Sequence, residues 1–138
     1  MIGLKRGTVM LCEHEKEWEN MAKETVSRLW ELFGENACDI RHVGSTSIRS
    51  IRAKPIIDIA VAVKSLDTVL PLVPRLERAG FIRRDTGDDA EMLFVCGDFE
   101  HDIRTHHIHV VPAESVEWRN YISFRDYLNA FPKKAGGI

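Results

Sequence analysis

Apolar positions follow two different spacings along the chain, and the spacings predict two kinds of element. From residue 18 to residue 33, apolar residues recur at steps of three and four, which places them on one face of a helix. A similar spacing over Leu66–Arg78 and from Ser115 to Pro132 predicts two more helices. Shorter apolar runs, each bounded by turn-forming residues, predict strands over residues 37–43, 56–63, 81–84, 92–96 and 104–111.

The apolar face of the first helix is expected to pack on the protein core. It carries two tryptophans in register with aliphatic residues, which favours core packing over ligand stacking. The residues of this face are Trp18, Met21, Ala22, Val26, Leu29, Trp30 and Phe33.

The order of these elements predicts an α+β fold. A helix, two strands, a helix, three strands and a last helix suit a mixed sheet of about five strands with helices packed on it. The polar run Asp85–Glu91 between two short strands is interpreted as a solvated hairpin loop. With 138 residues the chain is expected to form a single domain, in which residues 132–138 are a frayed tail.

The stretch Arg41–Val63 carries the features of a phosphate- or nucleotide-binding turn. Gly44 can bring bare backbone close to a ligand, and the hydroxyls of Ser45 and Thr46 can bond anionic oxygens, as can the N–H groups of a helix start. Cations that could hold a phosphate follow the turn, namely Arg49, Arg52 and Lys54, although surface charge is the alternative for each.

Asp58 is a carboxylate in an otherwise apolar strand, and burying it unpaired would cost several kcal/mol. Strand alternation places Asp58 and Ala60 on one face. Two interpretations stay open for Asp58: a catalytic or metal-binding residue in a cleft, and a structural ion pair.

A pair of histidines on a later strand offers metal ligands. Alternation sends His107 and His109 to one face and directs Ile108 and Val110 to the core. Neutral imidazoles bind transition metals, so with Asp58 they would suit zinc, manganese or iron, whereas magnesium prefers oxygen ligands. The alternative is that the pair hydrogen-bonds the backbone or Asp58 without a metal.

Three segments in order, HVGSTSIRSIRAKPIIDI, THHIHVV and SFRDYL, resemble the GrpB family, a branch of the nucleotidyltransferase superfamily. The resemblance covers residues 12–132 and implies a nucleotidyltransferase-like fold, in which the Gly-Ser turn holds nucleotide phosphates and strand carboxylates hold a divalent metal such as Mg, Mn or Zn. In that superfamily a later strand adds a third carboxylate. His107 and His109 are therefore expected beside Asp58, facing one cleft.

Ala60 is a departure from the superfamily pattern, which has a second carboxylate at this position. The resemblance therefore implies weak or absent magnesium-dependent nucleotidyl transfer. Three hypotheses follow: a nucleotidyltransferase, a non-catalytic module that binds a nucleotide or phosphorylated metabolite, which Ala60 favours, and a metal-dependent hydrolase that uses the histidines. A Ser-His-Asp hydrolase is the weakest, because Ser45 is not in a G-x-S-x-G segment.

Composition narrows the partners to small ligands. A formal charge of −2 argues against a general nucleic-acid-binding surface. Three widely spaced cysteines suggest reduced thiols rather than a disulfide framework. No apolar run reaches the roughly 18 residues of a membrane span, and the N-terminus lacks a secretory pattern, so a cytoplasmic protein that binds a small phosphorylated ligand or nucleotide is expected.

Overall fold

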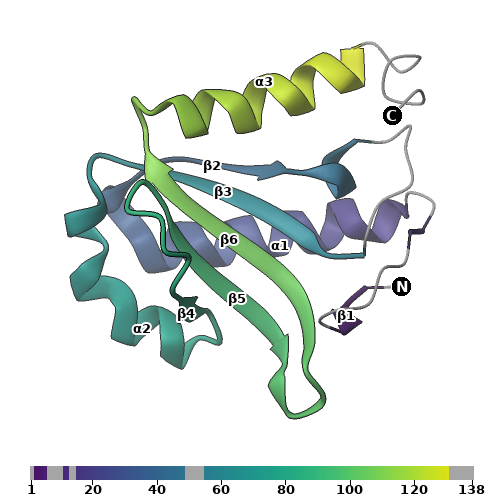
Figure 1. The fold of residues 1–138 in the computed structure, drawn as a ribbon, viewed down its shortest axis with the longest axis horizontal. Helices are drawn as coiled ribbons and strands as arrows, with labels where there is room; N and C mark the ends of the chain where they lie inside the picture. The colour runs from purple at the N-terminus through teal and green to yellow at the C-terminus, as the bar shows by residue number, and fades with distance from the viewer. Residues whose placement is uncertain (1, 6–10, 13–14, 49–54, 131–138) are drawn as a thin grey trace.

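A six-stranded mixed sheet is the centre of the fold in the computed structural model, which describes residues 2–5, 11–12, 15–48 and 55–130 (Figure 1). The strands are β1 (Leu4–Lys5), β2 (Ala37–Val43), β3 (Ile57–Val63), β4 (Ile82–Arg84), β5 (Met92–Asp98) and β6 (Ile103–Pro112). Five of them follow the order β2-β3-β6-β5-β4, and β1 pairs with β6. The expected α+β class and mixed sheet are confirmed.

The two central strands, β3 and β6, run parallel, and the other pairs along this sheet are antiparallel. Their register sets Asp58 opposite His107 and Ala60 opposite His109. On its other side Asp58 pairs with Val43, the last residue of β2. The chain thus places the expected site residues side by side through backbone pairing alone.

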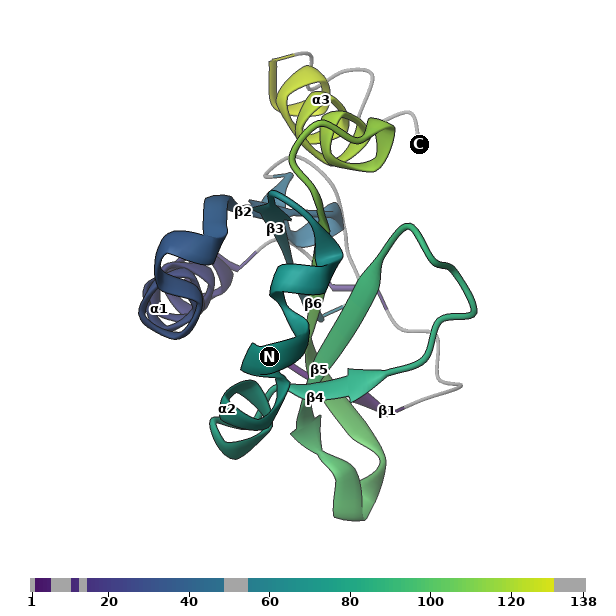
Figure 2. The same cartoon turned by 90° about the vertical axis from the view of Figure 1, so that its left-hand side faces the viewer.

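The helices are α1 (Lys16–Phe33), α2 (Val73–Arg78) and α3 (Val116–Ala130). Figure 2 shows α1 and α2 on one side of the sheet and α3 apart from them, above β2. The core lies between α1 and the sheet, and its buried cluster includes Trp18 and Leu29 of α1, Ile59 of β3 and Ile108 of β6. The alternation of β3 and β6 then turns Asp58, His107 and His109 to the opposite face.

The second predicted helix differs from its expectation. Residues 66–78 form two 3-10 turns, Leu66–Thr68 and Leu70–Leu72, before the short α2 begins. Pro71 and Pro74 explain the difference, because proline has no N–H and its ring clashes with the carbonyl four residues earlier. An α-helix can therefore begin only where Pro74 falls in its first turn.

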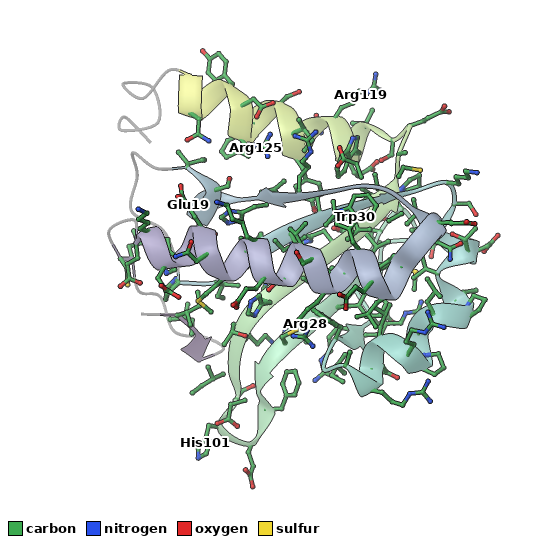
Figure 3. All side chains as sticks on the ribbon, turned by 180° about the vertical axis from the view of Figure 1, so that it is seen from behind. Glu19, Arg28, Trp30, His101, Arg119 and Arg125 are labelled. Atoms are coloured by element: carbon green, nitrogen blue, oxygen red, sulfur yellow. The ribbon has the colours of Figure 1, made fainter. Side chains whose placement is uncertain are left out.

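Trp30, which is labelled on α1 in Figure 3, also differs from its expectation. It is 40% exposed, whereas Trp18 is fully buried. Leu29 and Phe33 take the places that face the sheet. Trp30 follows Leu29 by about 100° around the helix and so lies at the border of the apolar face.

Several expectations fall on residues that the structure does not describe. These are the cations Arg49, Arg52 and Lys54 and the frayed tail at 132–138. Within the described residues, no helix has both the length and the apolar character needed to cross a membrane.

Candidate functional site

The turn after β2 is built on a glycine that lies against Asp58. Gly44 has a φ of +71°, a backbone conformation that disfavours side chains. A Cβ at this position would lie 2.6 Å from Oδ2 of Asp58 and 2.8 Å from its Cβ. A 3-10 turn, Ser45–Ser47, follows directly. Glycine here therefore lets the turn backbone touch the carboxylate of the neighbouring strand.

The hydroxyls of Thr46 and Ser47 bond groups of the turn and of the chain beside it. Thr46 is fully buried, donates a hydrogen bond to the carbonyl of Ile56 at 3.3 Å, and lies 2.9 Å from Nε2 of His42. The Ser47 hydroxyl donates to the Gly44 carbonyl at 2.6 Å. A phosphate-binding role of Thr46 stays a prediction, and the bonds that its hydroxyl makes in this structure hold the turn together. The side chain of Ser45 lies outside the described part of the chain.

Asp58 and the two histidines meet on one face of the sheet, as expected. Oδ1 of Asp58 lies 2.9 Å from Nε2 of His109 and 3.8 Å from Nδ1 of His107. All three side chains are largely buried, with 18–26% of their surface exposed. Each offers a ligand atom, and these atoms lie within 4.8 Å of one another. The placement is confirmed, and a role in metal binding stays a prediction.

Glu91 and Tyr121 complete the cluster, and the sequence analysis singles out neither. The Nδ1–H of His109 donates to Oε1 of Glu91 at 2.8 Å, and the Tyr121 hydroxyl donates to the same oxygen at 2.7 Å. Glu91 falls in the predicted solvated loop, yet only 17% of its side chain is exposed. Extending the alternation of β5 back by one residue would place it opposite the core-facing Met92.

The surrounding charges and burial give the two histidines different protonation states. Burial lowers the pKa of His109, but its hydrogen bonds to Asp58 and Glu91 outweigh this effect and raise the pKa to about 9. Burial lowers the pKa of His107, and the attraction of Asp58 only partly opposes it. At neutral pH His109 is therefore an imidazolium between two carboxylates, and His107 is neutral.

The donor set suits a transition metal better than magnesium, because two of its three members are imidazoles. Nε2 of His107 is buried and has no hydrogen-bond partner within the described residues. A metal would require His109 to lose the proton that it now shares with Asp58. His109 and Asp58 are hydrogen-bonded in this structure, as the metal-free alternative expects. The distances between the three ligand atoms also permit a shared ion.

A hollow of about 430 Å³ lies beside this cluster. It is lined by Gly44 of the turn and by α3 residues Glu117, Asn120, Tyr121 and Phe124. Glycine on one wall and aromatic rings on the other give it an apolar character with two polar side chains. The hollow adjoins the metal candidates through Gly44 and Tyr121.

Two side chains of α3 tie this helix to the turn. Arg125 donates to the carbonyl of His42 at 3.3 Å, and Asn129 donates to the carbonyl of Ser47 at 3.0 Å. Arg125 also pairs with Asp126 at 2.6 Å. Arg125 thus braces α3 against β2, and Asn129 braces it against the turn.

Comparisons with known proteins show which family and fold the chain resembles. A family model described as GrpB protein matches residues 8–136. The chain is 41% identical over 135 residues to the Glutamate-rich protein GrpB of Alkalihalophilus pseudofirmus, covering 96% of this chain and 78% of that relative. It spans 37% of another curated relative.

Two solved structures share the fold. The crystal structure of GrpB from Enterococcus faecalis superposes with a TM-score of 0.81 at 28% identity, over 90% of this chain and 74% of that one. The structure of Cid1 in complex with its product ApU gives a TM-score of 0.61 at 10% identity, over 88% of this chain and 37% of Cid1. At that identity the second likeness concerns the fold alone.

Proposed function

The chain belongs to the GrpB family, and from that premise we propose that it binds a nucleotide or phosphorylated metabolite beside the Gly44 turn, together with one divalent cation. Asp58, His107 and His109 would hold the cation. The observation that carries this proposal is the approach of their three ligand atoms to within 4.8 Å, next to a glycine turn.

The shared fold supports a nucleotide as ligand. Solved Cid1 complexes contain ApU and the UTP analogue UMPNPP. The hollow along α3 offers Tyr121 and Phe124 as apolar surface, and Asn120 and Glu117 as hydrogen-bonding groups. A ligand whose phosphates face Asp58 through a cation could place its remaining part there.

Each of these residues would have a different role in binding. Asp58 would supply negative charge to a cation, and His107 would supply a neutral nitrogen. Gly44 lets the backbone approach the ligand. A bound cation would neutralise phosphate oxygens and polarise the phosphorus centre.

Binding without efficient nucleotidyl transfer is the form of the proposal that we favour. Ala60 is fully buried on the same face as Asp58 and offers no ligand atom. Two divalent ions in a transfer site need bridging carboxylates to offset their charge, and this strand supplies one. The imidazole donors favour a metal-dependent hydrolase as the second candidate, since a metal held by histidines can activate water.

A thermal-shift panel tests the proposal. Nucleotides and phosphorylated metabolites would be scored with and without Mg²⁺, Mn²⁺ and Zn²⁺, for the wild type and Asp58→Asn. We expect at least one ligand to raise Tm with Mn²⁺ or Zn²⁺, since a ligand at a hundred times its Kd adds about 2.7 kcal/mol of stability. The shift should vanish in Asp58→Asn and persist in Asp89→Asn, which changes an exposed carboxylate.

The absence of any metal-dependent shift would refute the proposal. So would shifts of equal size in the wild type and Asp58→Asn, because the cation would then bind elsewhere. Hydrolysis of a phosphate ester in the presence of Zn²⁺ or Mn²⁺ would favour the second candidate function, a metal-dependent hydrolase.

A further inference from the structure

We infer that Glu91 and Tyr121 are positioning residues for His109, which fix its ring so that Nε2 faces Asp58. The inference rests on the proposed metal site and deepens it, because it names the residues that would set the geometry and donor strength of one ligand. Neither residue belongs to the set of metal candidates itself.

The hydrogen bonds form a continuous series from α3 to β3. The Tyr121 hydroxyl donates to Oε1 of Glu91 at 2.7 Å, and Nδ1–H of His109 donates to that same oxygen at 2.8 Å. Nε2 on the far side of the ring lies 2.9 Å from Asp58. Because the two nitrogens of an imidazole point in different directions, holding Nδ1 on Glu91 directs Nε2 toward Asp58.

Packing restrains the ring as well. The centroid of the Tyr121 ring lies 5.1 Å from that of His109, at an angle of 33° between the planes. The side chains of His109 and Glu91 are 18% and 17% exposed, so water competes little for their bond. His109 therefore cannot turn without breaking contacts to two other elements.

His107 lacks such support. Its Nδ1 is 3.8 Å from Asp58, beyond hydrogen-bond distance, and its Nε2 has no partner in the part of the chain that is described. The two imidazoles meet edge to face, at 86° and with centroids 6.2 Å apart. The contrast indicates that the Glu91 and Tyr121 contacts are specific to one histidine.

A carboxylate behind a ligating histidine is a recognised determinant of metal affinity. It selects the tautomer, orients the ring and makes the outward nitrogen a stronger donor, and its loss lowers affinity by about 10–100-fold. Tyr121 would act one step further back, by directing Oε1 of Glu91. Since Tyr121 also lines the hollow beside Gly44, a ligand there would contact the residue that orients this carboxylate.

Cobalt titration of purified protein tests the inference. Co²⁺ substitutes for zinc and reports ligand geometry through its visible absorption bands. Glu91→Ala should weaken Co²⁺ binding by about 10–100-fold and alter the bands, and Glu91→Gln, which keeps an acceptor oxygen, should recover part of the loss. Tyr121→Phe should give a smaller loss. Asp89→Asn and Tyr127→Phe are matched controls at exposed positions and should match the wild type.

A second measurement needs no metal. The Nδ1 proton of His109, held by Glu91, should appear as a downfield NMR resonance that exchanges slowly with water. The resonance is assigned by its loss in His109→Gln. It should be absent from Glu91→Ala, and its persistence in that variant would overturn the inference whatever the metal data show.

The outcomes separate the two proposals. If the wild type and Asp58→Asn bind Co²⁺ equally or not at all, the proposed metal site fails, and the NMR result alone decides whether Glu91 orients His109. If Co²⁺ binding requires Asp58 but Glu91→Ala leaves affinity and absorption bands unchanged, the metal site stands and the positioning role is overturned.

Discussion

Gly44 is under two physical constraints that only glycine satisfies. Its φ of +71° strains any residue with a side chain, and the side of its Cα where a Cβ would stand lies against the carboxylate of Asp58. The first constraint concerns the backbone alone, and the second concerns the site. Gly87 allows the two constraints to be tested separately. It has the same φ as Gly44, but a Cβ at this position would meet nothing within 4 Å.

Gly44→Ala should therefore destabilise the protein more than Gly87→Ala does. We expect a loss of about 1–2 kcal/mol for Gly87→Ala from backbone strain. Gly44→Ala should lose a further 1–3 kcal/mol, roughly, because the methyl group must displace Asp58. Urea unfolding of both variants measures the difference, and equal losses would show that the turn yields without disturbing the carboxylate.

The raised pKa of His109 predicts a pH dependence of stability. The folded protein favours the imidazolium form, so this contribution is complete below pH 6.5 and is lost as pH rises through about 9. It amounts to about 3 kcal/mol at most, since one pKa unit corresponds to about 1.4 kcal/mol. The difference in free energy of unfolding between the wild type and His109→Asn should thus be larger below pH 6.5 than above pH 9.

A difference between wild type and His109→Asn that stays constant over this pH range would contradict the prediction. It would mean that His109 is equally protonated in the folded and unfolded states.

At the scale of elements, β3 carries the candidate site residue Asp58, and the neighbouring strands determine what surrounds each of its positions. Position 60 shares the face of Asp58 and pairs with His109 on β6. Position 62 shares that face too but pairs with Val111, farther along the strand. Both alanines are buried, so the two positions differ mainly in their distance from the candidate ligands.

Ala60→Asp should increase affinity for Mg²⁺ or Mn²⁺, because it restores a second carboxylate beside the first. Ala62→Asp should not, although both variants should lose stability from a buried carboxylate. Isothermal titration with each metal compares them. An unchanged affinity in Ala60→Asp would show that carboxylate count does not limit metal binding in this chain.

Five of the six strands can be predicted from the sequence because each is a short apolar run bounded by turn-forming residues. The expected boundaries of β2 are those observed, and Ile108 and Val110 face the core as alternation requires. Residues 66–78 cannot be predicted in detail, since the apolar spacing does not show how Pro71 and Pro74 shorten a helix. The spacing also misplaces Trp30, because this residue lies at the border of the apolar face.

The candidate site is predictable where it depends on strand pairing. Asp58 and the histidines meet because β3 and β6 are neighbours, which the family resemblance suggests. Thr46 and Glu91 are not predictable in the same way. Whether a hydroxyl bonds its own turn, or a loop carboxylate folds inward, depends on contacts with residues distant in sequence.

At the scale of the whole molecule, one face of the sheet packs on the core and the other carries the candidate site residues. Helices α1 and α2 cover the first face (Figure 2), and Asp58, His107 and His109 lie on the second, where His109 packs against Tyr121 of α3. The chain spans 37% of Cid1, with which it shares the fold at a TM-score of 0.61. The common fold by itself therefore assigns no activity to this chain.

Magnesium-dependent nucleotidyl transfer by this chain should be weak or absent. Asp58 and imidazoles leave a pair of magnesium ions with too little negative charge. Release of pyrophosphate from each nucleoside triphosphate with Mg²⁺ measures the activity. Robust turnover by the wild type that is lost in Asp58→Asn would show that one strand carboxylate suffices.

The exposed loop around Gly87 divides the candidate site between two halves of the chain. Gly44 and Asp58 precede the loop, and Glu91, His109 and Tyr121 follow it. Cutting the backbone there would leave each half with an incomplete set of ligands, and the two fragments would meet through the pairing of β3 with β6, of β4 with β5 and of β1 with β6. A metal signal from the mixed halves, absent from either alone, would then report fragment reassembly.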